Sequence, residues 1–248
     1  MPGLKVEIVK ADSLSMGDVD LWRGMVAANP ELASPYFDPN FTRIAAGVCP
    51  GAALAVLHRA GQVVGFFPHQ RRGRAIQPLA APMNDYHGVI ARPEAMPDLE
   101  TVAGLLGRSR LSVNAWVGPV RTGLARDTMM TVLPAEGYDA WYAERRSAFG
   151  KYFKDKERAR RSMEAELGPI RVERGLRDPA LLDHLIDLKR DQYRRTARHD
   201  IFACGWTGDL LQALMRSGSD TFGGNMAALW AGDRLCAIEY SLTGGDQC

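Results

Sequence analysis

Residues 82–88 bring together three side chains that can transfer protons. Asp85, Tyr86 and His87 supply a carboxylate, a phenol and an imidazole at consecutive positions. A carboxylate or an imidazole whose pKa lies near the working pH can act as a general base, removing the proton of an attacking amine or hydroxyl. The alternative is a plain turn, in which Asp85 accepts backbone N–H groups and Tyr86 packs. We predict that Asp85 is catalytic and that Tyr86 and His87 bind substrate.

A second group of candidate residues lies in a basic stretch, residues 145–161, which holds eight Lys or Arg and two acids. Lys151, Lys154 and Arg158 recur at intervals of three and four, so on a helix they share one face. A solvated basic face is the simplest interpretation, followed by contact with an anionic substrate. Nucleic acid comes last, because no helix-turn-helix, zinc-finger or RNP motif accompanies the stretch. We predict that these three side chains bind substrate.

The composition excludes several other classes of protein. The chain has 248 residues, of which 46% are apolar and 24% charged, with a formal net charge of +2. Its cysteines are far apart and have no histidine at metal-ligand spacing, so neither a metal site nor a disulfide framework is expected. The N-terminus alternates polar and apolar residues, and no stretch approaches the ~18 apolar residues of a membrane span. These features predict a cytoplasmic protein with no membrane span.

Catalytic motifs of four familiar enzyme classes are missing from the sequence. There is no GxSxG, no HExxH, no P-loop and no dinucleotide fingerprint. Serine hydrolases, zinc proteases, NTPases and NAD-dependent enzymes therefore lack their signatures here.

Hydrophobic periodicity predicts a mixed α/β fold. Asp18 is expected to cap a short helix, and the proline-rich residues 68–97 to form an extended loop region. Residues 139–167 are expected to form one helix or a helix pair, and Thr207 to cap a later helix. The other expected elements are strands at 4–9, 52–58, 62–67, 111–117, 128–133, 170–174, 226–231 and 235–242, and helices at 99–106 and 181–188.

Two of the predicted hairpins, at 57–67 and 229–240, resemble each other. Each has an apolar strand, an Ala-Gly turn and a second apolar strand with a small residue near its start. A duplication would make residues 1–135 and 136–248 two similar domains. The second domain would be incomplete, because only six residues follow its hairpin. Two unrelated hairpins are the alternative, since Gly turns are common.

Five segments in a fixed order point to a family. They are ASPYFDPNFTRIA at 33–45, AALAVLHRAGQVVGFFPHQRR at 52–72, PMNDYHGVI at 82–90, FGKYFKDKERARRSMEAELGPIRVE at 149–173 and MAALWAGDRLCAIEYSLTGG at 226–245. In this order they resemble the CelD/FemAB-like branch of the GNAT acyltransferases, often labelled cellulose- or exopolysaccharide-biosynthesis proteins. The resemblance covers nearly the whole chain.

The resemblance implies two GNAT folds in tandem and transfer of an acyl group from acyl-CoA, the co-substrate, to an amine or hydroxyl of a small-molecule or saccharide acceptor. It also implies a second candidate base, Glu239, because GNAT enzymes often place such a carboxylate on a central strand. Alternation puts Glu239 opposite to Ile238 and Tyr240, although many strand glutamates merely face solvent. Family members continue beyond the second hairpin with elements that grip acyl-CoA, so we expect a C-terminally truncated chain.

Two other functions stay open at this point. One is a FemAB-like transfer of an aminoacyl group from charged tRNA, in which the basic stretch would bind the phosphates of the tRNA. The other is a binding module without catalysis, which the missing terminal elements favour.

Residues 70–75, QRRGRA, match the pattern of the pyrophosphate-binding loop in GNAT enzymes. That loop works only where a helix follows it, whereas Pro78 and Pro82 follow here. We interpret the match as chance in a basic turn. The guanidinium groups of Arg71, Arg72 and Arg74 can still contact an anionic substrate.

Overall fold

The computed structural model describes residues 3–107, 110–121 and 134–244. By its internal contacts the chain divides into two compact units. The first unit comprises residues 1–122, 175–226 and 240–248, and the second comprises 123–174 and 227–239. The expected domain boundary at 135 stays a prediction, and the expected strand at 128–133 lies outside the described residues.

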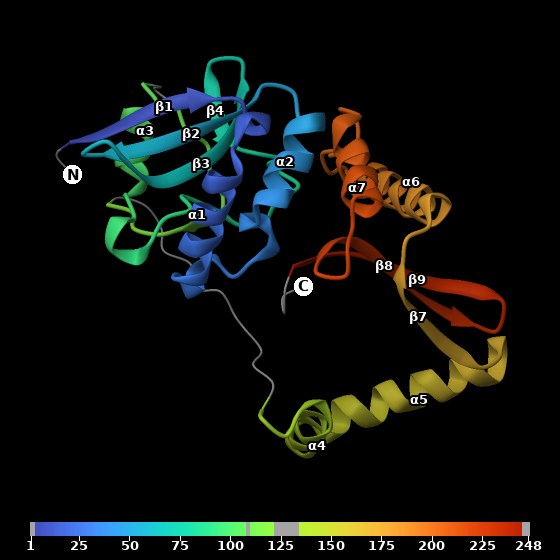
Figure 1. Cartoon of the computed structure of the whole chain (residues 1–248). Coiled ribbons are helices and arrows are strands. Elements are labelled where there is room, and N and C mark those ends of the chain that lie inside the picture. Colours follow the sequence, from blue (N-terminus) through green and yellow to red (C-terminus); the bar gives the residue numbers. More distant parts are fainter. Residues whose placement is uncertain (1–2, 108–109, 122–133, 245–248) are drawn as a thin grey trace. The chain divides into compact units, whose positions relative to one another are not determined.

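A four-stranded antiparallel sheet forms the frame of the first unit, as Figure 1 shows. In spatial order its strands are β1 (Leu4–Val9), β2 (Ala52–Arg59), β3 (Gln62–Arg72) and β4 (Ala75–Pro78). Ala60 and Gly61, with φ of 50° and 81°, form the two-residue turn between β2 and β3. Positive φ at both positions is what a type I′ hairpin turn requires. The expected first strand and first hairpin are confirmed.

Strand β3 is longer than expected, because it continues through Pro68 to Arg72. A proline is tolerated in a strand only where its missing N–H has no ladder partner. The Pro68 carbonyl accepts the Leu79 N–H at 3.2 Å, next to β4. In an antiparallel strand the N–H and C=O of one residue point to the same side. The missing N–H therefore does not interrupt the pairing with β2, where Pro68 lies opposite Leu54.

Helices α1 (Met16–Ala27) and α2 (Pro39–Val48) lie against this sheet. Ser15, not Asp18, caps α1. The Ser15 hydroxyl accepts the Asp18 N–H at 3.2 Å, and the Asp18 carboxylate accepts the Ser15 N–H at 3.0 Å. The sequence-based assignment was wrong because the acidic residue of such a capping box stands at the third helical position. Next to the sheet, Trp22 is fully buried.

The proline-rich residues 68–97 contain the end of β3 and the strand β4, so they are not only loop as expected; after β4 they form just β5 (His87–Gly88) and the 3-10 helix η4 (Pro93–Ala95). The helix α3 (Leu99–Leu105) follows, and β5 pairs in parallel with β6 (Trp116–Val117). The strand expected at 111–117 is therefore shorter than predicted. Leu111 makes one isolated bridge to Ile76, and the Asn114 N–H bonds to the His87 ring instead of a neighbouring strand.

Two helices, α4 (Tyr138–Ala148) and α5 (Gly150–Leu167), form most of the described second unit. Phe149 separates them, since its ψ of 42° departs from the helical value. Gly168, with φ of 104°, ends α5 in a conformation that favours glycine. The expected helix pair is confirmed, and neither helix has a buried residue in its described part.

The remaining elements follow in the order strand, two helices, two strands. They are β7 (Ile170–Leu176), α6 (Pro179–Arg195), α7 (Trp206–Arg216), β8 (Phe222–Ala231) and β9 (Arg234–Gly244). The strands form a sheet in the order β7-β8-β9. Only two residues join β8 to β9, a connection that antiparallel strands alone permit. The second expected hairpin is confirmed.

Thr207 does not cap α7, contrary to the prediction. The helix begins at Trp206, and the buried Thr207 hydroxyl donates to the Ile201 carbonyl at 2.7 Å. The hydroxyl thus ties the preceding turn to the helix instead of accepting a helical N–H.

A hydrophobic core of the first unit joins α2 to α7, to the start of β8 and to the end of β9. Its buried members are Phe41, Ala45, Cys49, Leu79, Ala80, Leu210, Leu214, Phe222 and Leu242. Among the helices of the described segments, none is long and apolar enough to cross a membrane.

Candidate functional site

Asp85 lies in an exposed loop of the first unit beside the phenol of Tyr36. Tyr36 stands in the 3-10 helix η3 (Pro35–Phe37), which Ser34 caps. The Tyr36 hydroxyl donates to Asp85 Oδ2 over 3.4 Å, and the rings of Tyr36 and Tyr86 lie 6.4 Å apart between centroids. Burial, reinforced by the Asp85 carboxylate, raises the pKa of Tyr36 above its usual range. A neutral phenol is therefore held next to a solvent-accessible carboxylate.

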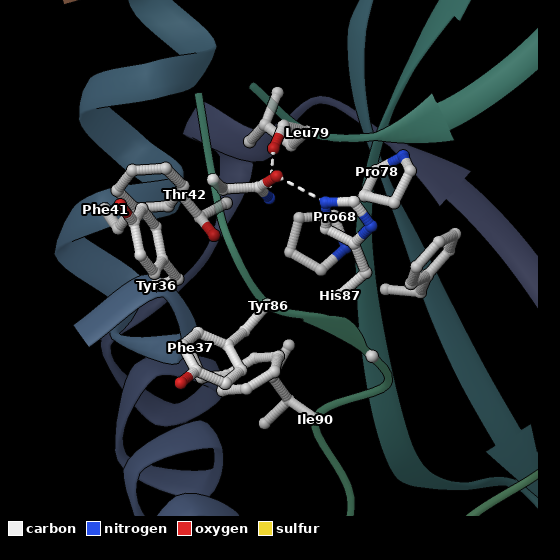
Figure 2. A pocket seen from close by; sticks show the side chains of 13 residues that line it. Tyr36, Phe37, Phe41, Thr42, Pro68, Pro78, Leu79, Tyr86, His87 and Ile90 are labelled. Atoms are coloured by element: carbon white, nitrogen blue, oxygen red, sulfur yellow. Dashed lines mark hydrogen bonds between the residues drawn. The ribbon is translucent and has the colours of Figure 1, made fainter. Parts of the chain in front are cut away.

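Buried contacts fix the position of Tyr36. The Trp22 indole N–H donates to the Phe37 carbonyl at 2.7 Å, which ties η3 to helix α1. The Tyr36 ring also meets the ring of Phe41 edge-on, with 5.2 Å between centroids (Figure 2). The phenol thus rests on the core of the unit and not on a free loop.

His87 is buried, and both of its ring nitrogens have partners. Nδ1 accepts the backbone N–H of Asn114 at 3.3 Å, so Nε2 bears the proton and donates to the Asn84 side-chain oxygen at 2.5 Å. The Asn84 amide in turn donates to the Leu79 carbonyl (Figure 2). Burial lowers the pKa of His87. A neutral imidazole with both nitrogens engaged positions the loop that bears Asp85 and is poorly suited to act as a base.

A small cavity of about 20 Å³ lies beneath this loop, among the side chains drawn in Figure 2. The Thr42 hydroxyl at its wall is buried and has no hydrogen-bond partner within the described segments. A space of this size holds one water molecule, which the Thr42 hydroxyl can bind. The cavity is too small for a substrate.

Tyr240 of β9 is a second neutral phenol in the first unit. Its hydroxyl donates to the Leu211 carbonyl of α7 at 3.0 Å. Burial, with a smaller contribution from Tyr36, raises the pKa of Tyr240 above its usual range. Neither Tyr36 nor Tyr240 was predicted as a site residue. Their sequence signals are that Tyr36 lies in the family-like segment 33–45 and that Tyr240 lies in the family-like segment 226–245, directly after Glu239.

Gly224 of β8 leaves room for the Tyr240 hydroxyl, because a Cβ at position 224 would overlap that oxygen. We expect Gly224→Ala to displace the phenol and to cost about 1–3 kcal/mol of unfolding free energy, as overpacking does. Urea denaturation of both proteins measures this cost. Gly24→Ala, in open space within α1, is the matched control and should stabilise by about 0.5–1 kcal/mol. Equal effects of the two changes would contradict the proposed contact.

Glu239, the other predicted base, is exposed on β9 and belongs to the second unit, whereas Asp85 belongs to the first. Its exposure, between the half-buried Ile238 and Tyr240, agrees with the expected alternation. Its catalytic role stays a prediction.

The three basic candidates lie on α5 of the second unit, and all are exposed. Arg158 donates to the Asp155 carboxylate at 3.4 Å, a surface contact of little energy. The structure thus places Lys151, Lys154 and Arg158 on a solvated helix that has no buried residue in its described part. Their contact with an anionic substrate stays a prediction.

Residues 70–75 form the end of β3, a turn at Gly73 and Arg74, and the start of β4. No helix begins there, so the backbone offers no helix N-terminus for a pyrophosphate. The interpretation of QRRGRA as a basic turn agrees with this geometry.

Comparison with known families identifies one similarity. Residues 150–248, which include every element from α5 to β9, match a family model described as an acetyltransferase (GNAT) domain. No curated protein and no solved structure matches the chain significantly. This similarity of the C-terminal part to a GNAT acetyltransferase domain suggests acyl-CoA-dependent acyl transfer. The tandem arrangement of two such domains stays a prediction.

Proposed function

We propose that this protein moves an acyl group from an acyl-CoA to an amine or hydroxyl of a small-molecule or saccharide acceptor. The match of residues 150–248 to the GNAT domain is the observation that carries this proposal. The exposed Asp85 carboxylate beside the neutral phenol of Tyr36 supports it, because acyl transfer uses a proton acceptor and a hydrogen-bond donor close together.

In the proposed reaction, Asp85 removes the proton from the acceptor's nucleophilic nitrogen or oxygen. The bound acyl-CoA supplies the thioester carbonyl that this nucleophile attacks. The C–S bond then breaks, the acyl group remains on the acceptor, and the CoA sulfur leaves as a thiol with the proton that Asp85 had taken up, which restores the carboxylate. Tyr36 is protonated at neutral pH and, once Asp85 has taken up the acceptor's proton, can turn its hydroxyl hydrogen bond toward developing negative charge.

The finer assignment to the CelD/FemAB-like branch, and hence to polysaccharide metabolism, rests on the order of the five segments along the chain. A basic, exposed α5 is compatible with an anionic saccharide acceptor through Lys151, Lys154 and Arg158. It is also the observation that favours aminoacyl transfer from tRNA, since Tyr152 on the same helix is 59% exposed and stacks under Lys156.

The direct test incubates the full chain with acetyl-CoA or a longer acyl-CoA and a panel of amino and hydroxyl sugars. We expect acceptor-dependent release of free CoA, quantified by chromatography because the exposed Cys204 and Cys236 would react with thiol reagents. Mass spectrometry should show the acylated sugar. Filter binding with charged tRNA separates the alternative, since retention of tRNA without any turnover of acyl-CoA would overturn the acyl-CoA proposal.

A further inference from the structure

A second, much larger cavity of about 380 Å³ lies in the first unit, within the range of small-molecule sites. One wall comes from the end of β3, the residues after it and the loop at Ser112 and Asn114, and the other from the turn before α7. The lining side chains that bear on the ligand are Arg72, Ser112, Asn114, His199, Asp200 and Trp206.

Hydrogen bonds hold both walls in place. On the first wall, the Gln77 amide donates to the Ala81 carbonyl at 2.7 Å, and the His87 ring is fixed from both sides. On the second wall, the Asp200 carboxylate accepts the Phe202 N–H at 2.9 Å, and Thr207 binds the Ile201 carbonyl. A pocket with preformed walls loses little entropy when a ligand binds.

The charges of the lining favour an anion. Asp200 forms an ion pair with Arg190 at 2.9 Å, so its negative charge is balanced outside the pocket. Arg72 supplies the only Lys or Arg side chain of the described lining. Within the residues that the structure describes, its guanidinium has no hydrogen bond or ion pair. A guanidinium without a partner presents a planar pair of donors that fits a carboxylate or a phosphate.

The other polar groups of the lining suit the hydroxyls of a sugar, and its indole ring suits the C–H face of a sugar. Ser112, Asn114 and His199 bring hydroxyl, amide and imidazole groups, and Trp206 brings a half-buried ring. An indole ring packs against apolar C–H surface, and the polar groups pair with hydroxyls. His87, which lines the pocket, belongs to the same loop as Asp85 and therefore connects the pocket to the candidate base.

We propose that this pocket is the acceptor site and that it selects a sugar with an anionic group, either a carboxylate or a phosphate, which Arg72 binds. This inference rests on the proposed acyl transfer, because only that function makes the ligand an acceptor. Binding itself needs no acyl-CoA and is measured separately.

The test is ligand-observed NMR titration of the full chain with glucuronic acid, glucose 6-phosphate and neutral glucose. We expect saturable binding of at least one anionic sugar, and the stronger of the two identifies the group that Arg72 binds. Arg72→Gln should weaken that binding about tenfold or more. Arg74→Gln is the matched control, since Arg74 lies exposed in the same turn but outside the lining, and it should leave binding unchanged.

Three results would overturn the proposal: no saturable binding of either anion, glucose binding as tightly as the anions, or equal losses from the two arginine variants. The acyltransferase assay distinguishes this failure from that of the proposed function. If acyl transfer occurs but Arg72→Gln leaves the KM of every acceptor unchanged, the pocket assignment is wrong and the function stands. If anionic sugars bind through Arg72 but no acyl group is transferred, the function is wrong and this pocket is an anionic-sugar site without an acceptor role.

Discussion

Asp85→Asn is expected to lower kcat for acyl transfer by roughly 10²–10⁴-fold, the usual contribution of a general base. The substitution keeps the shape of the side chain and an oxygen that can still accept the Tyr36 hydroxyl, now at 3.4 Å from Asp85. It removes the basic oxygen that takes the acceptor's proton. Because binding contacts are preserved, KM should change little, and steady-state kinetics with one acyl-CoA and one acceptor measure both constants.

Two further variants serve as comparisons for the Asp85→Asn result. Asp20→Asn on α1 removes an exposed carboxylate of the same unit and should leave kcat unchanged. Glu239→Gln tests the other predicted base. If Glu239→Gln abolishes turnover while Asp85→Asn retains the wild-type kcat, then Glu239 is the base and the assignment of Asp85 is wrong. A loss in Asp85→Asn that is matched by Asp20→Asn would instead indicate a general effect of charge.

Local patterns predicted much of the fold because the responsible interactions are close in sequence. The hairpin turn at Gly61 and the stop at Gly168 follow from backbone conformations that glycine adopts easily. The predicted helix caps were wrong where a side chain had two possible hydrogen-bond partners. Asp18 and Thr207 are both good capping residues, yet one completes a capping box and the other bonds a preceding carbonyl. Sequence alone does not choose between such partners.

The candidate site was predicted only in part, because its contacts join distant segments. Asp85, Tyr86 and His87 were found as a local cluster, but the partner of Asp85 is Tyr36, 49 positions earlier. Tyr240 reaches the carbonyl of Leu211, 29 positions away. Strand pairing and helix packing create these encounters, and no periodicity in the sequence reveals them.

The fold also explains why His87 is not the proton-transfer group that its residue type suggests. An imidazole in a short polar segment suggests proton transfer, yet the fold buries it and supplies a donor on one side and an acceptor on the other. Burial lowers its pKa below the ordinary histidine value, which favours the neutral ring. Of the three residues in this cluster, we therefore propose proton transfer only for Asp85, whose carboxylate is exposed.

Trp22→Ala is expected to be the most destabilising of the substitutions considered, with a loss of about 3–5 kcal/mol in the free energy of unfolding. Trp22 is fully buried, and its ring stacks on Phe66 with 4.9 Å between centroids. Removing it leaves a large cavity and an unpaired Phe37 carbonyl. Urea denaturation followed by far-UV circular dichroism measures the loss, because that signal does not depend on tryptophan. Met16→Ala, at a 74% exposed position of the same helix, should change stability by less than about 0.5 kcal/mol.

Trp22→Phe separates the packing of the ring from the indole hydrogen bond. It also tests whether that hydrogen bond positions the candidate site. A phenyl ring can still stack on Phe66, but it cannot donate to the Phe37 carbonyl, so the expected cost is about 1–3 kcal/mol. Because Phe37 is next to Tyr36, the loss of this bond should also loosen the phenol beside Asp85. We expect Trp22→Phe to lower kcat at temperatures where it remains folded, whereas Met16→Ala should not. Wild-type stability of Trp22→Ala would contradict the packing argument, and wild-type kcat in Trp22→Phe would show that the indole hydrogen bond stabilises the fold without positioning Tyr36.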